Sequence, residues 1–589
     1  MESSSSFDAS YGYPGQLEEP FSHHYPLHNY NTIQSEHEQH HQHETIDQSQ
    51  SCCFGTLRVP TMNVCLSRID VWLLRFDLPP FRLLSCVLLT SALAVFPSYY
   101  FSIVNVDIDQ FKLFINVSFK ESWGIKLCDQ AHMNNATIAD SCDGRQEVWL
   151  ALMIAVFNLG TLVGSLSVPA LADRLGRRNP LMLWNNLLAA GSCILMAFCW
   201  IRTSDPAEPP IVASFTMLLI GRTASGFAAG VAYGLLPLYL TEISPNEYRG
   251  FNGSCQNLMI SLNTLFSLVV AFPTLLGQHW IAMHLLGVPF AVLQMLLTRF
   301  LPETPKYLLL HKHDEIGARS ALAFFRPDIS DQEVVDLFTH YRSEELQAAS
   351  YKTTLKDVIR LRHLRQPIVI SCAVMTASIC TGIVAVFTYS TTMFGHSGLD
   401  EQWPAIASIV LSMFNCCGAV LANLLVERLG RRVLMMVGLI GCILALTLFM
   451  FVDFAVDRTG SEIVAWVGVV IMVVHVTVYN IGPGAIMWFI SAEVTPQSVR
   501  SYGVMATLFV NNLALIVLNF AYPPLLTVMG AWVMLLFIVP CTALTVFLYF
   551  VMPETKGREI DDIIRQWHPK QSQRNSYVTT VFTLNRRNR

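Results

Sequence analysis

Two repeated motifs decide the fold of this chain. ADRLGRRNP at 172–180 returns as VERLGRRVL at 426–434, and EISPNEYRG at 242–250 returns as EVTPQSVRS at 493–501. Both pairs recur in the same order along the chain. The sequence therefore predicts two related halves that arose by duplication, and such halves can rock against each other.

The composition is that of a membrane protein. The 589 residues are 52% hydrophobic and only 14% charged, whereas an average soluble chain carries about 25% charged residues. Apolar segments of about 20 residues, the length that crosses a hydrocarbon core of roughly 30 Å, recur after residue 80. We predict an all-α membrane protein with twelve transmembrane helices in two six-helix, pseudo-symmetric halves. The expected helices are 81–104, 148–170, 180–201, 211–240, 252–276, 280–301, 367–394, 404–426, 433–454, 463–490, 502–527 and 530–552.

The polar segments divide the chain further. Lys and Arg concentrate in 306–366 and in the short loops that hold the GRR motifs, and the positive-inside rule then places these loops and both termini in the cytosol. The polar, histidine-rich start of the chain is expected to be disordered, and a metal site there is disfavoured because no spaced cysteines accompany the histidines. We expect a multi-pass protein of the plasma membrane. Its expected domains are a cytosolic tail at 1–80, a first half at 81–305, a cytosolic helical segment at 306–366, a second half at 367–553 and a cytosolic tail at 554–589.

The loop between the first two expected helices then faces the outside or a lumen. It holds the glycosylation sequons of Asn116 and Asn135 together with Cys128 and Cys142. Glycosylation at both asparagines is the prediction, with chance occurrence of the sequons as the alternative. A disulfide between the two cysteines is an open possibility in an oxidising compartment.

Charged residues of the repeated motifs predict a gate at the cytosolic mouth. Opposite charges from the two halves can pair when that mouth is shut, and exposed ion pairs worth about 0–1 kcal/mol each suit a latch that opens often. The alternative is that the arginines only follow the positive-inside rule and bind lipid phosphates, but this does not explain the repeated acidic partners. The predicted gating residues are Asp173, Arg177, Arg178, Glu242, Arg249, Glu427, Arg431, Arg432, Glu493 and Arg500.

Further motifs carry a family resemblance. Together with the repeats, the chain resembles the sugar porters of the major facilitator superfamily, and animal facilitative glucose transporters in particular, over about residues 80 to 565. The resemblance implies a twelve-helix fold with alternating access about a central site. The motifs that carry it are GRTASGFAAGVAYGLLPLYLTE at 221–242, LPETPKYLL at 301–309, FTYSTTMFGHSG at 387–398, IGPGAIMWFISAE at 481–493 and MPETKG at 552–557.

The expected binding site departs from that family. In the glucose transporters that this chain resembles, amides of the helix matching 367–394 bind sugar hydroxyls, but the matched positions here are Ser378, Ile379 and Val384. Losing a buried hydrogen-bond partner costs about 1–3 kcal/mol, so ordinary hexose affinity is expected to suffer. The remaining asparagines either line a polar cavity or bond between helices. The resemblance implies substrate contacts from Asn257, Ser378, Asn415, Asn480, Trp488 and Asn512.

The sequence also bears on energy coupling and on other classes of function. Proton-coupled relatives need a carboxylate in the first helix, and the stretch 81–106 has none, so uniport is expected. Motifs for nucleotides, metals and catalysis are missing from the sequence, so we expect neither enzyme activity nor a cofactor nor a nucleic-acid partner. The prediction is a facilitative transporter of a small neutral solute, a sugar or sugar-like compound, in a lipid bilayer. A transporter-like nutrient sensor and an organic-ion carrier of the same superfamily are the alternatives.

Overall fold

The structure of the protein is a computed structural model. It describes residues 79–94, 96–106, 108–123, 145–201, 212–277, 279–350, 361–387, 390, 403–496 and 499–558. The predicted tails at 1–80 and 554–589 lie almost entirely outside these residues, as do Asn135, Cys128 and Cys142.

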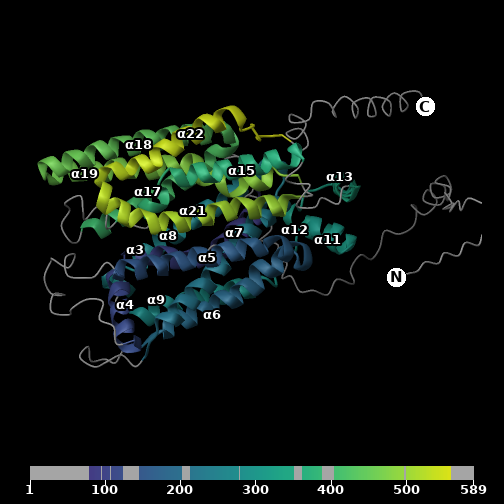
Figure 1. The fold of residues 1–589 in the computed structure, drawn as a ribbon. Coiled ribbons are helices and arrows are strands. Elements are labelled where there is room, and N and C mark those ends of the chain that lie inside the picture. The colour runs from purple at the N-terminus through teal and green to yellow at the C-terminus, as the bar shows by residue number, and fades with distance from the viewer. Residues whose placement is uncertain are drawn as a thin grey trace, which may run out of the picture. The chain divides into compact units, whose positions relative to one another are not determined.

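The described residues fold almost entirely into helices that run side by side in a bundle (Figure 1). The first half contains α2 (Phe81–Ala94), α3 (Tyr99–Val106), α4 (Ile108–Trp123), α5 (Arg145–Leu175), α6 (Asn185–Phe198), α7 (Phe215–Ile243), α8 (Arg249–Val270), α9 (Trp280–Leu285) and α10 (Gly287–Leu297). The second half contains α15 (Arg362–Cys380), α17 (Trp403–Leu429), α18 (Arg431–Thr459), α19 (Glu462–Tyr479), α20 (Ala485–Val494), α21 (Arg500–Met529) and α22 (Leu535–Val551).

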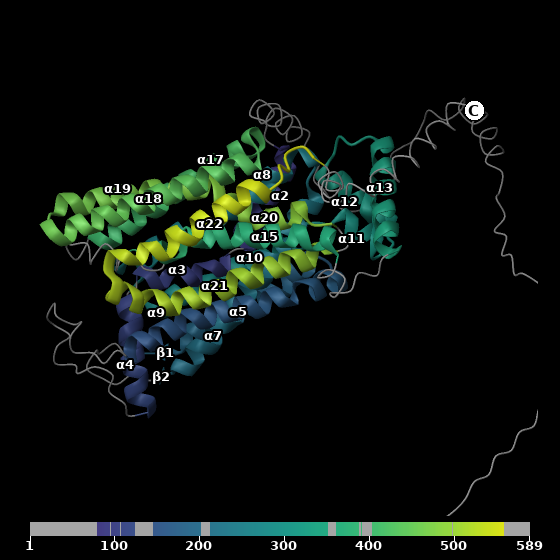
Figure 2. The same ribbon diagram turned by 45° about the horizontal axis from the view of Figure 1, so that its top comes forward.

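Three shorter helices join the two halves at one end of the bundle. They are α11 (Pro305–Leu310), α12 (Glu315–Phe325) and α13 (Asp331–Ser350), and both views place them beyond the same end of the long helices (Figures 1 and 2). The repeated charged motifs lie at this end, which we call the motif end. At the opposite end, strands β1 (Trp200–Ile201) and β2 (Val212–Ala213) form one short antiparallel pair.

Ten of the described helical stretches are long and apolar enough to cross a membrane. The shorter apolar helix Leu364–Cys380 and the 22-residue α8 complete the twelve expected helices. α8 has the length to span a bilayer, but its buried side chains include several asparagines and serines, which lower its hydropathy. The match of 252–276 is thus set apart by its polar residues, and the match of 367–394 by its short described length.

Glycines let α5 and α7 pack closely in the first half. Gly160 and Gly164 of α5 lie against the backbone of α7, and Gly226 and Gly230 of α7 lie against the backbone of α5. A methyl group at any of these positions would collide with a backbone carbonyl of the opposite helix. The small-xxx-small spacing of these residues thus produces the close helix approach that such spacing favours in membranes.

A break in the helix that follows 463 positions one of the predicted site residues. Residues Asn480–Gly484 form a π-helical segment between α19 and α20, and this segment contains Pro483. Proline cannot donate the usual helical hydrogen bond, and π segments often accompany functional positions. The break places Asn480 at the junction of the two helices, in the interior of the bundle.

Candidate functional site

Three buried asparagines from three helices form a hydrogen-bonded cluster, which we call the amide cluster. Asn257 of α8 donates from Nδ2 to Oδ1 of Asn480 over 2.8 Å. Asn480 in turn donates to Oδ1 of Asn415 in α17 and to the carbonyl oxygen of Val476. Each asparagine is at most 4% exposed. Because α8 belongs to the first half while α17 and α19 belong to the second, the amide cluster joins the two halves inside the bundle.

The chemistry of the amide cluster suits a hydroxylated ligand. A primary amide offers two N–H donors and a carbonyl acceptor with two lone pairs, which matches the donor and acceptor pattern of a hydroxyl group. Buried amides are costly without partners, and here they satisfy one another across the two halves. A solute with several hydroxyls can replace these hydrogen bonds, whereas an apolar solute leaves the amides unpaired.

Two other predicted substrate contacts are Trp488 and Asn512. Each has a polar side-chain atom that forms no hydrogen bond with the described residues. Trp488 of α20 is half-buried, and its ring centroid lies 5.0 Å from that of Tyr233 in α7, across the two halves. Asn512 of α21 donates to the carbonyl of Leu508 over 2.9 Å. Within the described part of the chain, Nε1 of Trp488 and Oδ1 of Asn512 are buried without a hydrogen-bond partner. A polar solute or ordered water would satisfy both atoms.

Ser378 differs from the other predicted contacts because its hydroxyl bonds to its own helix. Its Oγ donates to the carbonyl of Val374 over 2.9 Å, and the hydroxyl of Thr376 donates to the carbonyl of Cys372 in the same way. Ser378 is fully buried, and among the described residues it has no hydrogen bond to the amide cluster. The hydroxyl-rich stretch of α15 therefore satisfies much of its own polarity, and Ser378 can offer a ligand only the lone pairs of its oxygen.

A buried charge network closes the motif end of the first half. Nη2 of Arg177 lies 3.0 Å from Oε1 of Glu242, and Oγ1 of Thr304 donates to the other oxygen of Glu242 over 2.7 Å. Glu303 accepts hydrogen bonds from the backbone N–H groups of Arg177 and Arg178. This carboxylate satisfies amides at the turn that leads into the next helix.

The second half repeats the same network. Arg431 pairs with Glu493 over 3.0 Å, and Thr555 donates to Glu493 over 2.9 Å. Glu554 accepts hydrogen bonds from the backbone N–H groups of Arg431 and Arg432 over 2.9 and 3.0 Å. The motifs LPETPKYLL at 301–309 and MPETKG at 552–557 occupy matching places in the two networks. Their repeated Glu-Thr pair is the signal that could have identified the roles of Glu303, Thr304, Glu554 and Thr555.

One contact of the predicted gate crosses between the halves. Oε1 of Glu427, in α17, accepts hydrogen bonds from the backbone N–H groups of Gly250 and Phe251, at the start of α8, over 2.8 and 3.1 Å. A carboxylate at a helix N-terminus satisfies unpaired N–H groups and is stabilised by the helix dipole. Glu427 also pairs with Arg431 over 2.8 Å. A side chain larger than hydrogen at Gly250 would collide with this pair, so the two halves meet tightly at the motif end.

The predicted latch of exposed ion pairs needs correction. The side chains of the pairs Arg177–Glu242 and Arg431–Glu493 are each at most 7% exposed, and neither pair crosses between the halves. Separating such buried partners leaves an uncompensated charge, so these pairs hold each half together. Asp173, which corresponds to Glu427 in the first copy of the motif, is exposed. The crossing contact is thus a carboxylate on backbone amides and comes from one copy of the motif.

The remaining predicted residues are also placed. Arg178 donates to the carbonyl of Leu301 and Arg432 to that of Tyr549, so both arginines bind backbone oxygens. Arg249 and Arg500 line a pocket at the motif end. Asn116 lies in α4, where its side-chain oxygen is buried.

Known proteins share this architecture and these motifs. A family model described as sugar (and other) transporter matches residues 100–567. The chain is 32% identical over 421 residues to facilitated glucose transporter member 3 of solute carrier family 2 from Canis lupus familiaris, covering 70% of this chain and 81% of the relative. It is also 32% identical over 417 residues to member 1 from Gallus gallus, with 70% and 81% covered.

Solved structures agree on the fold. The proton:xylose symporter XylE bound to 6-bromo-6-deoxy-D-glucose gives a TM-score of 0.67 at 18% identity, with 82% of this chain and 99% of that chain covered. The inward open conformation of XylE from E. coli gives 0.60 at 17% identity, with the same coverage. These comparisons and the twelve helices in two halves show that the chain is a multi-pass membrane protein that belongs to the sugar (and other) transporter family, as a sugar porter of the major facilitator superfamily.

Proposed function

We propose that this chain carries a small neutral, hydroxylated solute, a sugar or sugar-like compound, across a membrane by facilitated alternating access. The hydrogen bond between Asn257 and Asn480 is the observation that carries the proposal, because it joins the two halves through groups that suit sugar hydroxyls. The named relatives are facilitated glucose transporters, which supports the same class of substrate. Trp488 adds an aromatic face that can cover a sugar ring.

Solute binding begins with the motif end shut by Glu427. The solute enters from the opposite end and exchanges the hydrogen bond between Asn257 and Asn480 for bonds to its own hydroxyls. Because bonds are exchanged rather than lost, the net free energy is small, about 0.5–1.5 kcal/mol for each bond. The halves then separate at the motif end, where the backbone N–H groups of Gly250 and Phe251 exchange their hydrogen bonds to Glu427 for hydrogen bonds to water.

The proposed orientation places the motif end in the cytosol of a cell whose plasma membrane holds the protein. The basic residues of 306–366 and of the GRR loops support this orientation under the positive-inside rule. Both termini are then cytosolic. Since the stretch 81–106 contains no carboxylate, the solute gradient alone drives transport.

Uptake by proteoliposomes tests the proposal. The full chain is reconstituted with a panel of labelled hexoses, pentoses, polyols and organic ions, and wild type is compared with Asn480→Ala. We expect saturable uptake of at least one neutral hydroxylated solute, and its loss in the variant. The matched control is Asn186→Ala, because Asn186 is a buried asparagine of α6 that bonds to the carbonyl of Met182.

Other results would point to the alternative functions. Saturable binding of a sugar without flux would favour a nutrient sensor, and uptake restricted to charged compounds would favour an organic-ion carrier. Undiminished uptake by Asn480→Ala would remove the amide cluster from the transport site.

A further inference from the structure

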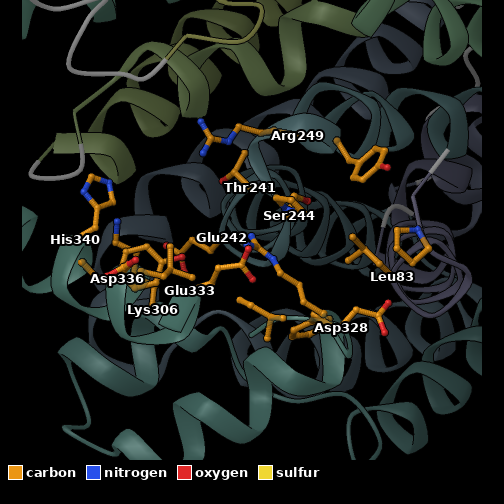
Figure 3. Close-up of a pocket in the computed structure, with 18 of the residues that line it drawn as sticks. Leu83, Thr241, Glu242, Ser244, Arg249, Lys306, Asp328, Glu333, Asp336 and His340 are labelled. Atoms are coloured by element: carbon orange, nitrogen blue, oxygen red, sulfur yellow. The ribbon is translucent and has the colours of Figure 1, made fainter. Parts of the chain in front are cut away.

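A pocket lies at the motif end, and its lining contains none of the asparagines of the amide cluster. Its volume is about 610 Å³, within the range of small-molecule sites of about 300–1,000 Å³. Figure 3 shows Lys306, Asp336 and His340 at one end of this motif-end pocket and Leu83 at the other. The lining comes from α2, α7, α8 and α11–α13, together with Arg500 at the start of α21. The pocket therefore brings together the first half, the joining helices and the second half.

Basic side chains form the inner wall of the motif-end pocket. Lys306 and Arg500 are 6% and 8% exposed, and the half-buried Arg249 and Arg326 also line the pocket. Of the acidic lining residues, Glu242 already bonds to Arg177 and Thr304. The other acidic lining residues are exposed to solvent, and they are Asp328, Glu333 and Asp336. The interior is thus positive and the rim is negative.

Arg326 is a basic residue of this wall with a buried side-chain donor. It directly follows α12, where its backbone N–H bonds to the carbonyl of Leu322 over 2.8 Å, which fixes the residue's position. Within the described residues, its Nε is buried and has no hydrogen-bond partner. Burial lowers the pKa of Arg326, and repulsion from Arg249 acts in the same direction, while Tyr341, Glu247 and Glu333 act in the opposite direction. A half-buried guanidinium with an unpaired donor gains free energy from a bound anion.

The rest of the wall suits a small organic group. Tyr248, Phe325 and Tyr341 line the pocket together with Leu83 and Ile329. Apolar and aromatic walls with a few polar groups are typical of small-molecule sites. A ligand that carries an anionic group and a compact organic body would match both parts of the lining.

We propose that the motif-end pocket binds a phosphate monoester, with its phosphate group among Arg249, Arg326 and Arg500. Guanidinium groups bind phosphate through paired, charge-assisted hydrogen bonds, which a lysine cannot reproduce. Because Arg500 belongs to the second half and Arg326 to the joining helices, the bound phosphate holds the motif end shut. The phosphate monoester belongs either to a soluble metabolite or to a lipid headgroup.

Binding to the full chain in phosphatidylcholine nanodiscs tests this inference. Phenyl phosphate, a phosphate monoester with a compact aromatic body, is titrated calorimetrically, and the variants are Arg326→Gln and Arg319→Gln. Arg319 lies in α12, the helix that ends just before Arg326, and it pairs with Asp331 in solvent, so it is the matched control. We expect saturable binding by wild type and Arg319→Gln, and affinity about tenfold weaker in Arg326→Gln, which corresponds to about 1.4 kcal/mol. Arg326→Lys should bind at an intermediate level, which separates loss of binding from loss of folding.

A second arm separates the two sources of phosphate. The titration is repeated in nanodiscs that contain phosphatidylinositol 4-phosphate. Phenyl phosphate binding that the lipid leaves unchanged supports a soluble ligand, and competition by the lipid that Arg326→Gln abolishes supports a headgroup. The inference is overturned if neither probe binds saturably, or if Arg326→Gln binds as well as wild type. These measurements require no flux, so they succeed or fail independently of the proposed transport.

Discussion

Asn257 and Asn480 lie in different halves of the chain and share a buried hydrogen bond of 2.8 Å. In a protein whose halves move against each other, a direct bond at this position closes the space between them. Under the proposed function, a solute that binds at the centre exchanges this bond for bonds to its own hydroxyls. The substrate-free site is therefore a set of amides that already satisfy each other.

Asn480 should contribute more to solute binding than Asn257. Asn480 bonds to both Asn257 and Asn415, so Asn480→Ala removes a partner from two buried amides, whereas Asn257→Ala removes one partner from Asn480, which keeps its bonds to Asn415 and Val476. An unsatisfied buried group costs about 1–3 kcal/mol, so we expect a larger drop in thermal stability and in solute affinity for Asn480→Ala. Unfolding midpoints and uptake KM of the two variants measure the difference. Equal effects would mean that Asn415 is not part of the cluster in the membrane.

The crossing contact at the motif end should depend on Glu427 and not on Asp173. Glu427→Ala removes the acceptor of the Gly250 and Phe251 amides, so the motif end should open more often. Cys255, one turn further along α8, is fully buried and lies 3.5 Å from Asn423 of the second half. We expect maleimide labelling of Cys255, followed by mass spectrometry, to be several-fold faster in Glu427→Ala.

The control for this prediction is Asp173→Ala. Asp173 is the exposed counterpart of Glu427, so its replacement should leave the labelling rate of Cys255 near that of wild type. Faster labelling in Asp173→Ala alone would show that the latch depends on the other copy of the motif.

The glycine of the second RLGRR copy should be essential for stability. Gly430 has φ of +88°, and a methyl group there would lie 2.7 Å from Oε2 of Glu554. Gly460 has φ of +59° with open space around it, so Gly460→Ala incurs only the backbone penalty of about 1–2 kcal/mol. Gly430→Ala should lower the unfolding midpoint further, because it also displaces Glu554 from the amides of Arg431 and Arg432. Similar midpoints for both variants would show that the Glu554 contact adds little.

The sequence predicted the fold well because duplication supplies information that hydropathy lacks. α8 is too polar for a hydropathy test of membrane spans, and the described part of α15 is short. The repeats require six helices in each half, so α8 and α15 are both counted as membrane helices. The polar residues that weaken the hydropathy signal of α8 include Asn257, which belongs to the amide cluster.

The gate was predicted only in part, for a physical reason. A search for opposite charges finds Glu427 and Glu493, but it does not reveal that Glu427 binds backbone amides of α8. Backbone donors carry no sequence signature, and the burial of Arg177 and Arg431 depends on tertiary packing. For the same reason the sequence did not show that the hydroxyl of Ser378 bonds to Val374 in its own helix.

An asparagine in place of Val384, shortly after the end of α15, should increase glucose affinity. Val384 is half-buried and Ser378 is fully buried, so an asparagine fits at 384 with less overpacking than a glutamine at 378. One regained hydrogen bond is worth about 0.5–1.5 kcal/mol, or roughly 2–13-fold in affinity. Glucose binding by Val384→Asn and Val384→Leu, the apolar control, measures the gain. An equal change in both variants would mean that shape, and not hydrogen bonding, governs the site.

Counterflow in proteoliposomes tests passive sugar transport through the amide cluster most directly. Vesicles are loaded with unlabelled solute, diluted into a trace of the labelled solute, and measured with and without a protonophore. The account predicts a transient accumulation of label above its equilibrium level, unaffected by the protonophore, present in Asn186→Ala and absent in Asn480→Ala. It is contradicted if no sugar or polyol shows counterflow, or if the accumulation requires a proton gradient.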